Sequence, residues 1–241
     1  MSDDILSRSF IYGTLAAALE PPAAETVGAL LSEKTKTALP RLASWATEGG
    51  ASDFPAAVAG WVQTFETLTL EKLRADHTRL FGHTARGTVC PYETEFGQEG
   101  EFQQPRQLGK INGFYNAFGL TVRREERERP DHVSCELEFM AFLSRKEAYA
   151  LEHGDREMLD QTRKAFRLFL RDHLGRFGRA FAFQLCKEDP REFFGRLGGV
   201  LYEFLTMECL RLQLEAGPPL LPLRPAEEDG VPMVCGNGDT E

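Results

Sequence analysis

The sequence lacks the short motifs with which many enzymes hold phosphates, metals or nucleophiles. It contains no GxxxxGKS or GxxxxGKT, no GxGxxG placed after a strand, no HExxH and no GxSxG. Cysteine is sparse: the five residues form no CxxC pair and no zinc-like spacing, and their number is odd. We therefore expect reduced thiols, no metal or other cofactor, no catalytic residue and a protein that is not an enzyme.

The features of an exported or membrane-embedded protein are also missing. No run of about eighteen apolar residues occurs, and the N-terminus has acidic residues where a secretory signal would have positive ones. The formal net charge of -9 opposes binding to a phosphate backbone but favours encounter with a basic peptide. We expect a cytoplasmic protein with no integral membrane segment and no nucleic-acid partner.

Strand-type alternation is almost absent, and apolar residues recur at helical spacing through most of the chain. Hydrophobic residues make up 42% of the sequence, which is enough for a packed core. Prolines and glycines mark the expected helix ends. These features predict an all-α, single-domain compact helical bundle. The expected helices cover residues 2–20, 23–47 with an interruption at Pro40, 53–81 with a bend or break, 105–118, 131–153, 155–174, 179–186 and 192–215.

Three stretches do not follow the helical pattern. Residues 82–104 contain glycines, a proline and scattered charges, which predicts a long internal loop of the kind that is often functional. The run RREERER at 123–129 is typical of a solvated connection. Residues 218–241 are rich in proline and glycine and predict an extended or partly disordered tail, outside a domain of residues 1–217. We expect this tail to be dispensable for folding.

The start of the predicted helix 131–153 carries an unusual group of polar residues. Asp131 follows a proline and is a natural N-cap. His132 and Glu136 are four residues apart, so they share one face of the helix. The structural interpretation is a capped helix with a His–Glu pair at the edge of the core. A metal site would need a further ligand, which the sequence does not identify.

The predicted loop also contains a distinctive segment. Tyr92, Glu93, Glu95 and Phe96 place two rings and two carboxylates close together. Rings in a loop are often only anchors to the core. The functional interpretation is an acidic, aromatic surface for an arginine-bearing peptide, because a guanidinium pairs with carboxylates and stacks on rings.

Several segments occur together in the order that is characteristic of one family. They are HTRLFG at 77–82, PYETEFG at 91–97, INGFYNAFGL at 111–120, ERPDHVSCELEFM at 128–140, FLRDHLGRFGRAF at 169–181 and FFGRLGGVLYEFL at 193–205. Over nearly its whole length the chain resembles the TorD/DmsD/NarJ family of molybdoenzyme assembly chaperones. The start of the fourth segment, Pro-Asp-His, is the most specific of these matches.

The resemblance implies a helical chaperone that binds the N-terminal leader of the catalytic subunit of a molybdenum-containing oxidoreductase. In many members that leader is a twin-arginine export signal, and the chaperone assists cofactor insertion before assembly or export. By motif position, Leu80 and Phe81 would form an apolar wall, Tyr92 a loop contact, and Asp131 and His132 the polar end of the leader site. The expected peptide-binding set also includes the acidic residues Glu93, Glu95 and Glu136.

Two other functions are compatible with the residues. One is a small helical metal-dependent or His–Asp acid–base enzyme, which would need side chains that converge in a closed pocket. The other is a generic peptide-binding adaptor with an unrelated partner. The chain also departs from some relatives at His77, where they have an aromatic residue. The sequence identifies neither the client nor its leader type, does not say whether nucleotide or molybdenum cofactor is bound, and leaves open monomer or domain-swapped dimer.

Overall fold

The computed structural model describes residues 2–46, 53–82, 87–97, 103–121 and 129–224 of the 241-residue chain. Within these ranges the regular structure is helical, and extended backbone pairs only in two isolated β-bridges. The all-α prediction is therefore confirmed. Most of the predicted charged connection, the tail from residue 225 and Cys235 lie outside the described residues.

The helices follow the predicted segments closely, and the expected break within 53–81 is present. Their bounds are α1 (Ser2–Leu19), α2 (Ala24–Leu30), α3 (Glu33–Ala46), α4 (Phe54–Gln63), the 3-10 helix η1 (Thr64–Glu66), α5 (Leu70–Phe81), the 3-10 helix η2 (Glu93–Glu95), α6 (Gln104–Ala117), α7 (Val133–His153), α8 (Arg156–Asp172), α9 (Leu174–Glu188) and α10 (Phe193–Arg211).

Pro40 is the main disagreement with the predicted helix bounds. We expected a break there, but Pro40 lies inside α3. The chain breaks earlier, at Ser32, whose hydroxyl donates to the Ala29 carbonyl at 2.8 Å and accepts from the Thr35 amide at 3.3 Å. A proline inside a helix costs about 3 kcal/mol or more. The packing of α3, in which Leu39 is buried, offsets that loss.

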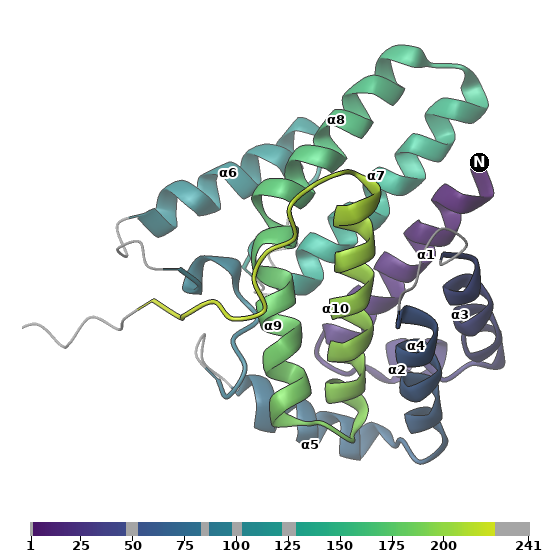
Figure 1. The fold of residues 1–241 in the computed structure, drawn as a ribbon, viewed down its shortest axis with the longest axis vertical. Coiled ribbons are helices and arrows are strands. Elements are labelled where there is room, and N and C mark those ends of the chain that lie inside the picture. Colours follow the sequence, from purple (N-terminus) through teal and green to yellow (C-terminus); the bar gives the residue numbers. More distant parts are fainter. Residues whose placement is uncertain (1, 47–52, 83–86, 98–102, 122–128, 225–241) are drawn as a thin grey trace, which may run out of the picture.

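Helices that are distant in sequence lie side by side in the bundle (Figure 1). α1 packs along α7, and α10 packs against both α9 and α4. Aromatic rings fill the spaces between helices. Tyr12 of α1 meets Phe204 of α10 with 4.7 Å between ring centroids, and Phe139 of α7 meets Phe169 of α8 at 4.8 Å. The buried apolar side chains form one continuous core from α1 to α10.

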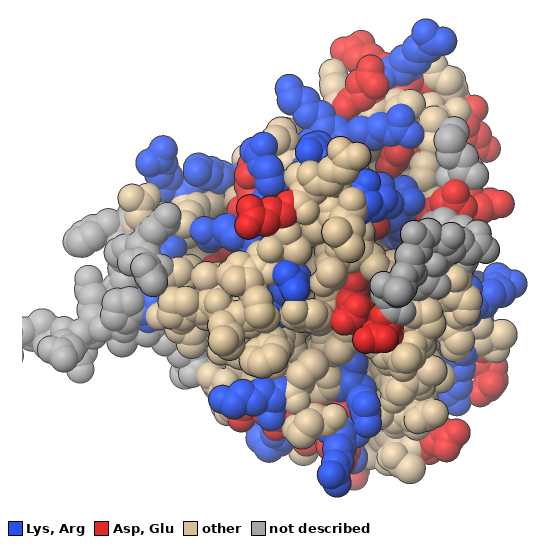
Figure 2. All heavy atoms as spheres, viewed as in Figure 1, with Lys and Arg blue, Asp and Glu red and all other residues tan. Residues whose placement is uncertain are grey.

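Both signs of charge are spread over the surface. Figure 2 shows basic and acidic side chains interspersed over one face, with uncharged stretches between them over α9, α10 and the segment that follows α10. None of the helices in the described part of the chain is long and apolar enough to cross a membrane.

The segment that follows α10 is extended, as predicted, but it is held against the bundle (Figure 1). We call residues 217–224 the C-terminal strap. At one end, the Gly217 amide donates to the Gly175 carbonyl of α9 at 3.0 Å. At the other end, Arg224 is only 2% exposed. That the tail is dispensable for folding stays a prediction; residues 217–224 are nevertheless held by partners in the bundle, as a buried arginine requires.

Two adjacent glycines of α10 test how closely this helix approaches α9. A methyl group on Gly198 would lie 2.6 Å from the Ala182 carbonyl oxygen, whereas one on Gly199 would meet nothing within 4 Å. We expect Gly198→Ala to lower the free energy of unfolding by roughly 1–3 kcal/mol. Gly199→Ala should leave it unchanged or raise it by up to about 1 kcal/mol. Chemical denaturation followed by circular dichroism measures both, and equal effects would contradict the close approach.

Candidate functional site

Backbone pairing joins the loop before α6 to the start of α7. Tyr92 and His132 form an antiparallel bridge. On either side of it, the Glu93 amide donates to the Asp131 carbonyl and the Val133 amide donates to the Pro91 carbonyl, both at 2.9 Å. The structure therefore brings together the loop motif PYETEF and the helix start PDH, as the resemblance implied.

Asp131 does not cap α7, contrary to our prediction. It is 0% exposed, and its carboxylate accepts hydrogen bonds from the Thr94 amide at 3.1 Å and the Thr94 hydroxyl at 2.8 Å. The Arg129 guanidinium donates to both carboxylate oxygens, at 3.0 and 2.8 Å. The carboxylate turns toward the loop because these donors compensate its buried charge more fully than a helix end would. The N-cap is the next residue, His132.

His132 caps α7 through a ring nitrogen. Its Nδ1 accepts a hydrogen bond from the Ser134 amide at 3.2 Å and lies 2.7 Å from the Ser134 hydroxyl. Burial, together with the neighbouring His77 and Arg129, lowers the pKa of His132 to about 3. The ring is therefore neutral at physiological pH. We had expected a His132–Glu136 pair, but the partner of the ring is Ser134.

Arg129 occupies the place that we expected an incoming arginine to take. Its Nη1 lies 3.0 Å from the Glu95 carboxylate, and its guanidinium carbon lies 4.5 Å from the centre of the Tyr92 ring. The acidic, aromatic arrangement predicted from the sequence is therefore present, but an arginine of the chain itself fills it. Arg129 also ends the run that we had interpreted as solvated, and its side chain is only 31% exposed.

A second pair of carboxyl groups lies deeper in the cluster. Glu93 is 1% exposed, and its carboxylate lies 3.0 Å from His173 Nδ1 and 3.3 Å from Arg176 Nη2. Glu136 is completely buried. Burial, and then the nearby charge of Glu93, raises the pKa of Glu136 well above its ordinary value. Burial therefore favours the protonated, neutral form of Glu136, while Glu93 already has the cationic Arg176 as a partner.

Leu80 and Phe81 lie in the core and do not form an open apolar wall. They are 0% and 6% exposed. Phe81 packs edge-on to Phe194 of α10 at 5.5 Å between centroids, and the His77 ring lies 4.7 Å from Phe81. Burial lowers the pKa of His77, so this ring is neutral, and it packs on Phe81 at the position where some relatives have an aromatic residue.

Of the eight predicted site residues, Tyr92 alone is partly exposed, and the other seven are buried. We call these eight residues, together with Thr94 and Arg129, the buried cluster. Within the described residues its charges are compensated by the chain itself. A ligand must therefore bind mainly to a surface beside the buried cluster.

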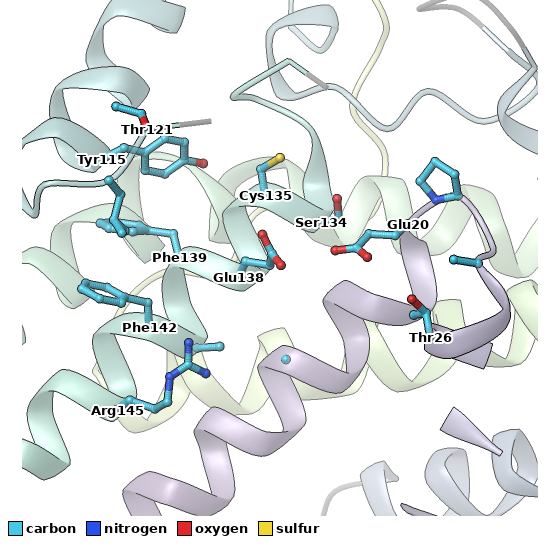
Figure 3. Close-up of a pocket in the computed structure, with 15 residues that line it drawn as sticks. Glu20, Thr26, Tyr115, Thr121, Ser134, Cys135, Glu138, Phe139, Phe142 and Arg145 are labelled. Carbon is cyan, nitrogen blue, oxygen red and sulfur yellow. The ribbon is translucent and has the colours of Figure 1, made fainter. Parts of the chain in front are cut away.

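Such a surface exists as a groove of about 870 Å³ between the ends of α1 and α6 and the first half of α7 (Figure 3). Figure 3 shows the rings of Tyr115, Phe139 and Phe142 on one side, Glu20 on the other, and Glu138 between them. Glu138 is exposed and forms no ion pair with a described residue. The groove therefore places the partly exposed ring of Phe142 near the exposed carboxylate of Glu138, and Arg145 also lines it.

The groove adjoins the buried cluster through Ser134, which lines the groove and hydrogen-bonds to His132. Sequence reasoning missed the groove because its residues come from four helices, α1, α2, α6 and α7, and from the segments that follow α1 and α6. One signal was present: Glu138 interrupts the apolar stripe of α7 between Leu137 and Phe139. An acidic residue at that place could have marked the border between a buried face and a binding face.

A second hollow, of about 740 Å³, has the opposite charge. Arg106, Lys110 and Arg176 line it, together with Glu93 and His173. Its cations would repel a basic peptide. Of the two hollows, the groove on α7 is therefore the one that suits a ligand carrying arginines.

The described residues do not bring together three or more His, Cys, Asp or Glu side chains that could hold a metal ion. Cys90 lies next to the loop, and burial raises the pKa of its thiol to about 12. A thiol with so high a pKa is a poor nucleophile at neutral pH.

Comparisons with a family model and with known proteins point to the same family. Residues 30–182, more than half of the chain, match the family model described as "Nitrate reductase delta subunit". The chain is similar to the chaperone protein TorD of Photobacterium profundum, with 32% identity over 134 residues. That match covers 56% of this chain and 59% of the TorD protein, which is less than two thirds of its length.

Two longer matches are to assembly chaperones of reductases. The selenate reductase assembly chaperone protein of Thauera selenatis is 31% identical over 154 residues, which cover 62% of this chain and 75% of that protein. The perchlorate reductase assembly chaperone protein of Dechloromonas aromatica is 30% identical over 178 residues, 72% of this chain and 74% of that protein.

The buried carboxylate of Asp131 should matter more to stability than an ordinary helix cap. We expect Asp131→Asn to lower the free energy of unfolding by roughly 1–3 kcal/mol, because the change weakens a charge-assisted network and leaves Arg129 incompletely compensated. The matched control is Asp155→Asn at the start of α8, where the carboxylate accepts only the Met158 amide at 2.9 Å. Asparagine is an equally good cap there. Similar losses in denaturant titrations of the two variants would show that the network contributes little.

The neutral carboxyl of Glu136 should make stability depend on pH. Its pKa is near 4.5 when unfolded and higher in the folded protein. Folding then takes up a proton between these values, so the contribution of Glu136 to stability falls as pH rises above 4.5. Glu136→Gln cannot ionise, so its melting temperature relative to wild type should rise by several degrees between about pH 5 and about pH 8.

Thermal unfolding of both proteins across this range measures the difference. The His132 ring has the opposite dependence, because its lowered pKa weakens the folded state as pH falls below 6.5. That contribution is present in both proteins and cancels in the comparison. A melting-temperature difference that stays constant with pH would contradict a neutral Glu136.

Proposed function

Since this chain belongs to the nitrate reductase delta subunit family, and its relatives include reductase assembly chaperones, we propose that it is an assembly chaperone for a molybdenum-containing oxidoreductase. Its partner would be the catalytic subunit of that enzyme. The chaperone would hold the N-terminal leader of the subunit in the cytoplasm while cofactor is inserted, before assembly or export.

The observation that supports leader binding most directly is the groove on α7. The partly exposed ring of Phe142 in its wall suits the apolar face of an amphipathic segment, while Phe139 lies buried behind it. Glu138 places an exposed carboxylate where an arginine of a leader could pair with it. The net charge of -9 would speed the encounter with such a basic segment.

The buried cluster would serve this function as a support. Asp131, Glu93 and Glu95 hold the loop by internal bonds, so a leader would not need to displace their partners. Tyr92 is the member of the predicted set that is exposed enough to touch a ligand directly. His132 positions the start of α7, and through Ser134 it positions the adjoining end of the groove.

The two alternative functions are less well supported. The chaperone names of the relatives favour a role in assembly over an enzymatic reaction. A generic adaptor would use the same groove for a different partner, so the identity of the bound peptide separates that function from the proposed one.

We expect the full chain to bind a labelled peptide with the N-terminal sequence of the catalytic subunit of a molybdenum oxidoreductase encoded beside it. Glu138→Lys should weaken this binding by roughly 1.5–3 kcal/mol, about tenfold or more in Kd. The change replaces a carboxylate that would pair with an arginine of the leader by a cation that repels it. The control is Glu152→Lys, which makes the same charge change at an exposed position near the other end of α7. Fluorescence anisotropy titrations of the three proteins measure the effect.

Wild-type affinity should also fall as salt rises, and less steeply in the Glu138 variant. A wild-type protein that is folded but does not bind the leader would disprove the proposed client. If wild type binds and Glu138→Lys binds equally well, the leader lies outside the groove.

A further inference from the structure

The C-terminal strap is bound to the loop in the manner of a peptide added to the edge of a sheet. Leu223 forms an antiparallel bridge with Phe96. The Gly97 amide donates to the Pro222 carbonyl, and the Arg224 amide donates to the Glu95 carbonyl, both at 2.8 Å. Main-chain bonds of this kind accept any extended segment, and the side-chain pockets beside them decide which sequence fits.

The side-chain pocket beside this edge holds an arginine. The Arg224 Nε donates to the Thr94 carbonyl at 2.6 Å, and its Nη2 donates to the Gln107 side-chain oxygen at 2.8 Å. Both acceptors lie more than a hundred positions earlier in the chain. The side chain is almost fully enclosed, at 2% exposure. A forked guanidinium meets two acceptors in this arrangement, which the single ammonium of a lysine would not match.

Apart from this pocket, the strap is held by little apolar contact. Leu220 is 72% exposed, Leu221 and Leu223 are only partly buried, and the strap contains no helix. Segments with few buried apolar contacts open locally at a small fraction of the free energy of global unfolding. The strap can therefore leave the edge while the helical core stays folded.

We propose that residues 94–97 and Gln107 form an exchangeable binding site for an extended, arginine-bearing peptide segment, and that the C-terminal strap occupies this site in cis. The partner segment is one with an arginine preceded by apolar residues. This site is distinct from the groove on α7. Exchange of the strap is independent of the proposed function, whereas entry of a client leader into the site rests on it.

A tethered occupant makes such a site selective. The strap is always present at a high effective concentration, so a free peptide must bind tightly to displace it. Displacement of the strap would also affect the buried cluster through Thr94. The Thr94 carbonyl accepts from Arg224, while its amide and hydroxyl donate to Asp131. Binding at the edge and the conformation of the loop are therefore coupled.

The first test is hydrogen exchange in the intact wild-type protein. The amides of Gly97 and Arg224, which form the two bonds of the bridge, should exchange at similar rates. Both should exchange about a hundredfold or more faster than core amides such as that of Leu201 in α10. If both amides exchange as slowly as the core amides, the strap is a permanent part of the fold and the proposal is overturned.

The second test supplies the strap in trans as a labelled peptide, PPLLPLRPAE, which has the sequence of residues 218–227. Full-length Arg224→Gln should bind this peptide about tenfold or more tightly than wild type does, because its own strap competes less well. Full-length Arg191→Gln is the control, since it loses an exposed arginine elsewhere and should bind like wild type. A peptide with glutamine in place of its arginine should bind Arg224→Gln about tenfold more weakly.

Equal binding by all three proteins, or no binding by Arg224→Gln while its helical spectrum is intact, would overturn the proposal. If Arg224→Gln does not fold, the exchange rates of the wild-type protein decide alone. A client leader added to the bound complex gives a separate result. If the leader fails to displace the strap peptide, the site still exchanges the strap, but the client leader does not bind there.

Discussion

The pairing between residues 91–96 and the start of α7 is the interaction on which the rest of the site depends. Asp131 at its centre is buried and charged, and such a group is stable in a protein interior only when charge-assisted hydrogen bonds compensate it. Thr94 and Arg129 supply those bonds. Because they fix the loop, they also set Tyr92 beside His132 and direct Glu93 toward His173.

The remaining polar groups of the buried cluster avoid uncompensated charge in two ways. His132 and Glu136 are neutral, since burial shifts their pKa values in opposite directions. Glu93 and Glu95 stay close to arginines of the chain. Among the described residues, the cluster therefore presents no uncompensated charge, whereas Glu138 is exposed at the surface on a helix whose start the cluster holds in place.

The loop is held by arginines from two directions. Arg129 approaches from the segment before α7, and Arg224 approaches from the C-terminal strap. Both bond to Thr94, one at its hydroxyl and the other at its carbonyl. A loop with this support is rigid as long as both arginines are in place, and Arg224 is the more enclosed of the two, at 2% exposure against 31% for the side chain of Arg129. This asymmetry gives the C-terminus of the chain influence over a loop that begins more than a hundred residues earlier.

The sequence by itself determined the helices, because the apolar period of a segment such as α7 or α10 reports a buried face whatever the segment packs against. It also indicated the residues that would lie together around Tyr92 and Asp131. It failed at Pro40, where tertiary packing outweighs one lost hydrogen bond, and at the cap of α7. The N-cap preference of Asp considers only neighbouring residues. It could not predict that Thr94, 37 positions earlier, would supply two donors to Asp131.

Only the tertiary structure decided which predicted site residues are exposed, where the groove runs and what the strap does. Whether Leu80 or Glu136 is exposed depends on helices from distant parts of the chain that pack over it. The sequence around each residue therefore cannot predict its exposure. The groove is a space left between α1, α2, α6 and α7. The site of Arg224 is made by a backbone carbonyl and a glutamine, which carry no distinctive sequence signal. Local patterns specify elements, whereas long-range packing specifies surfaces.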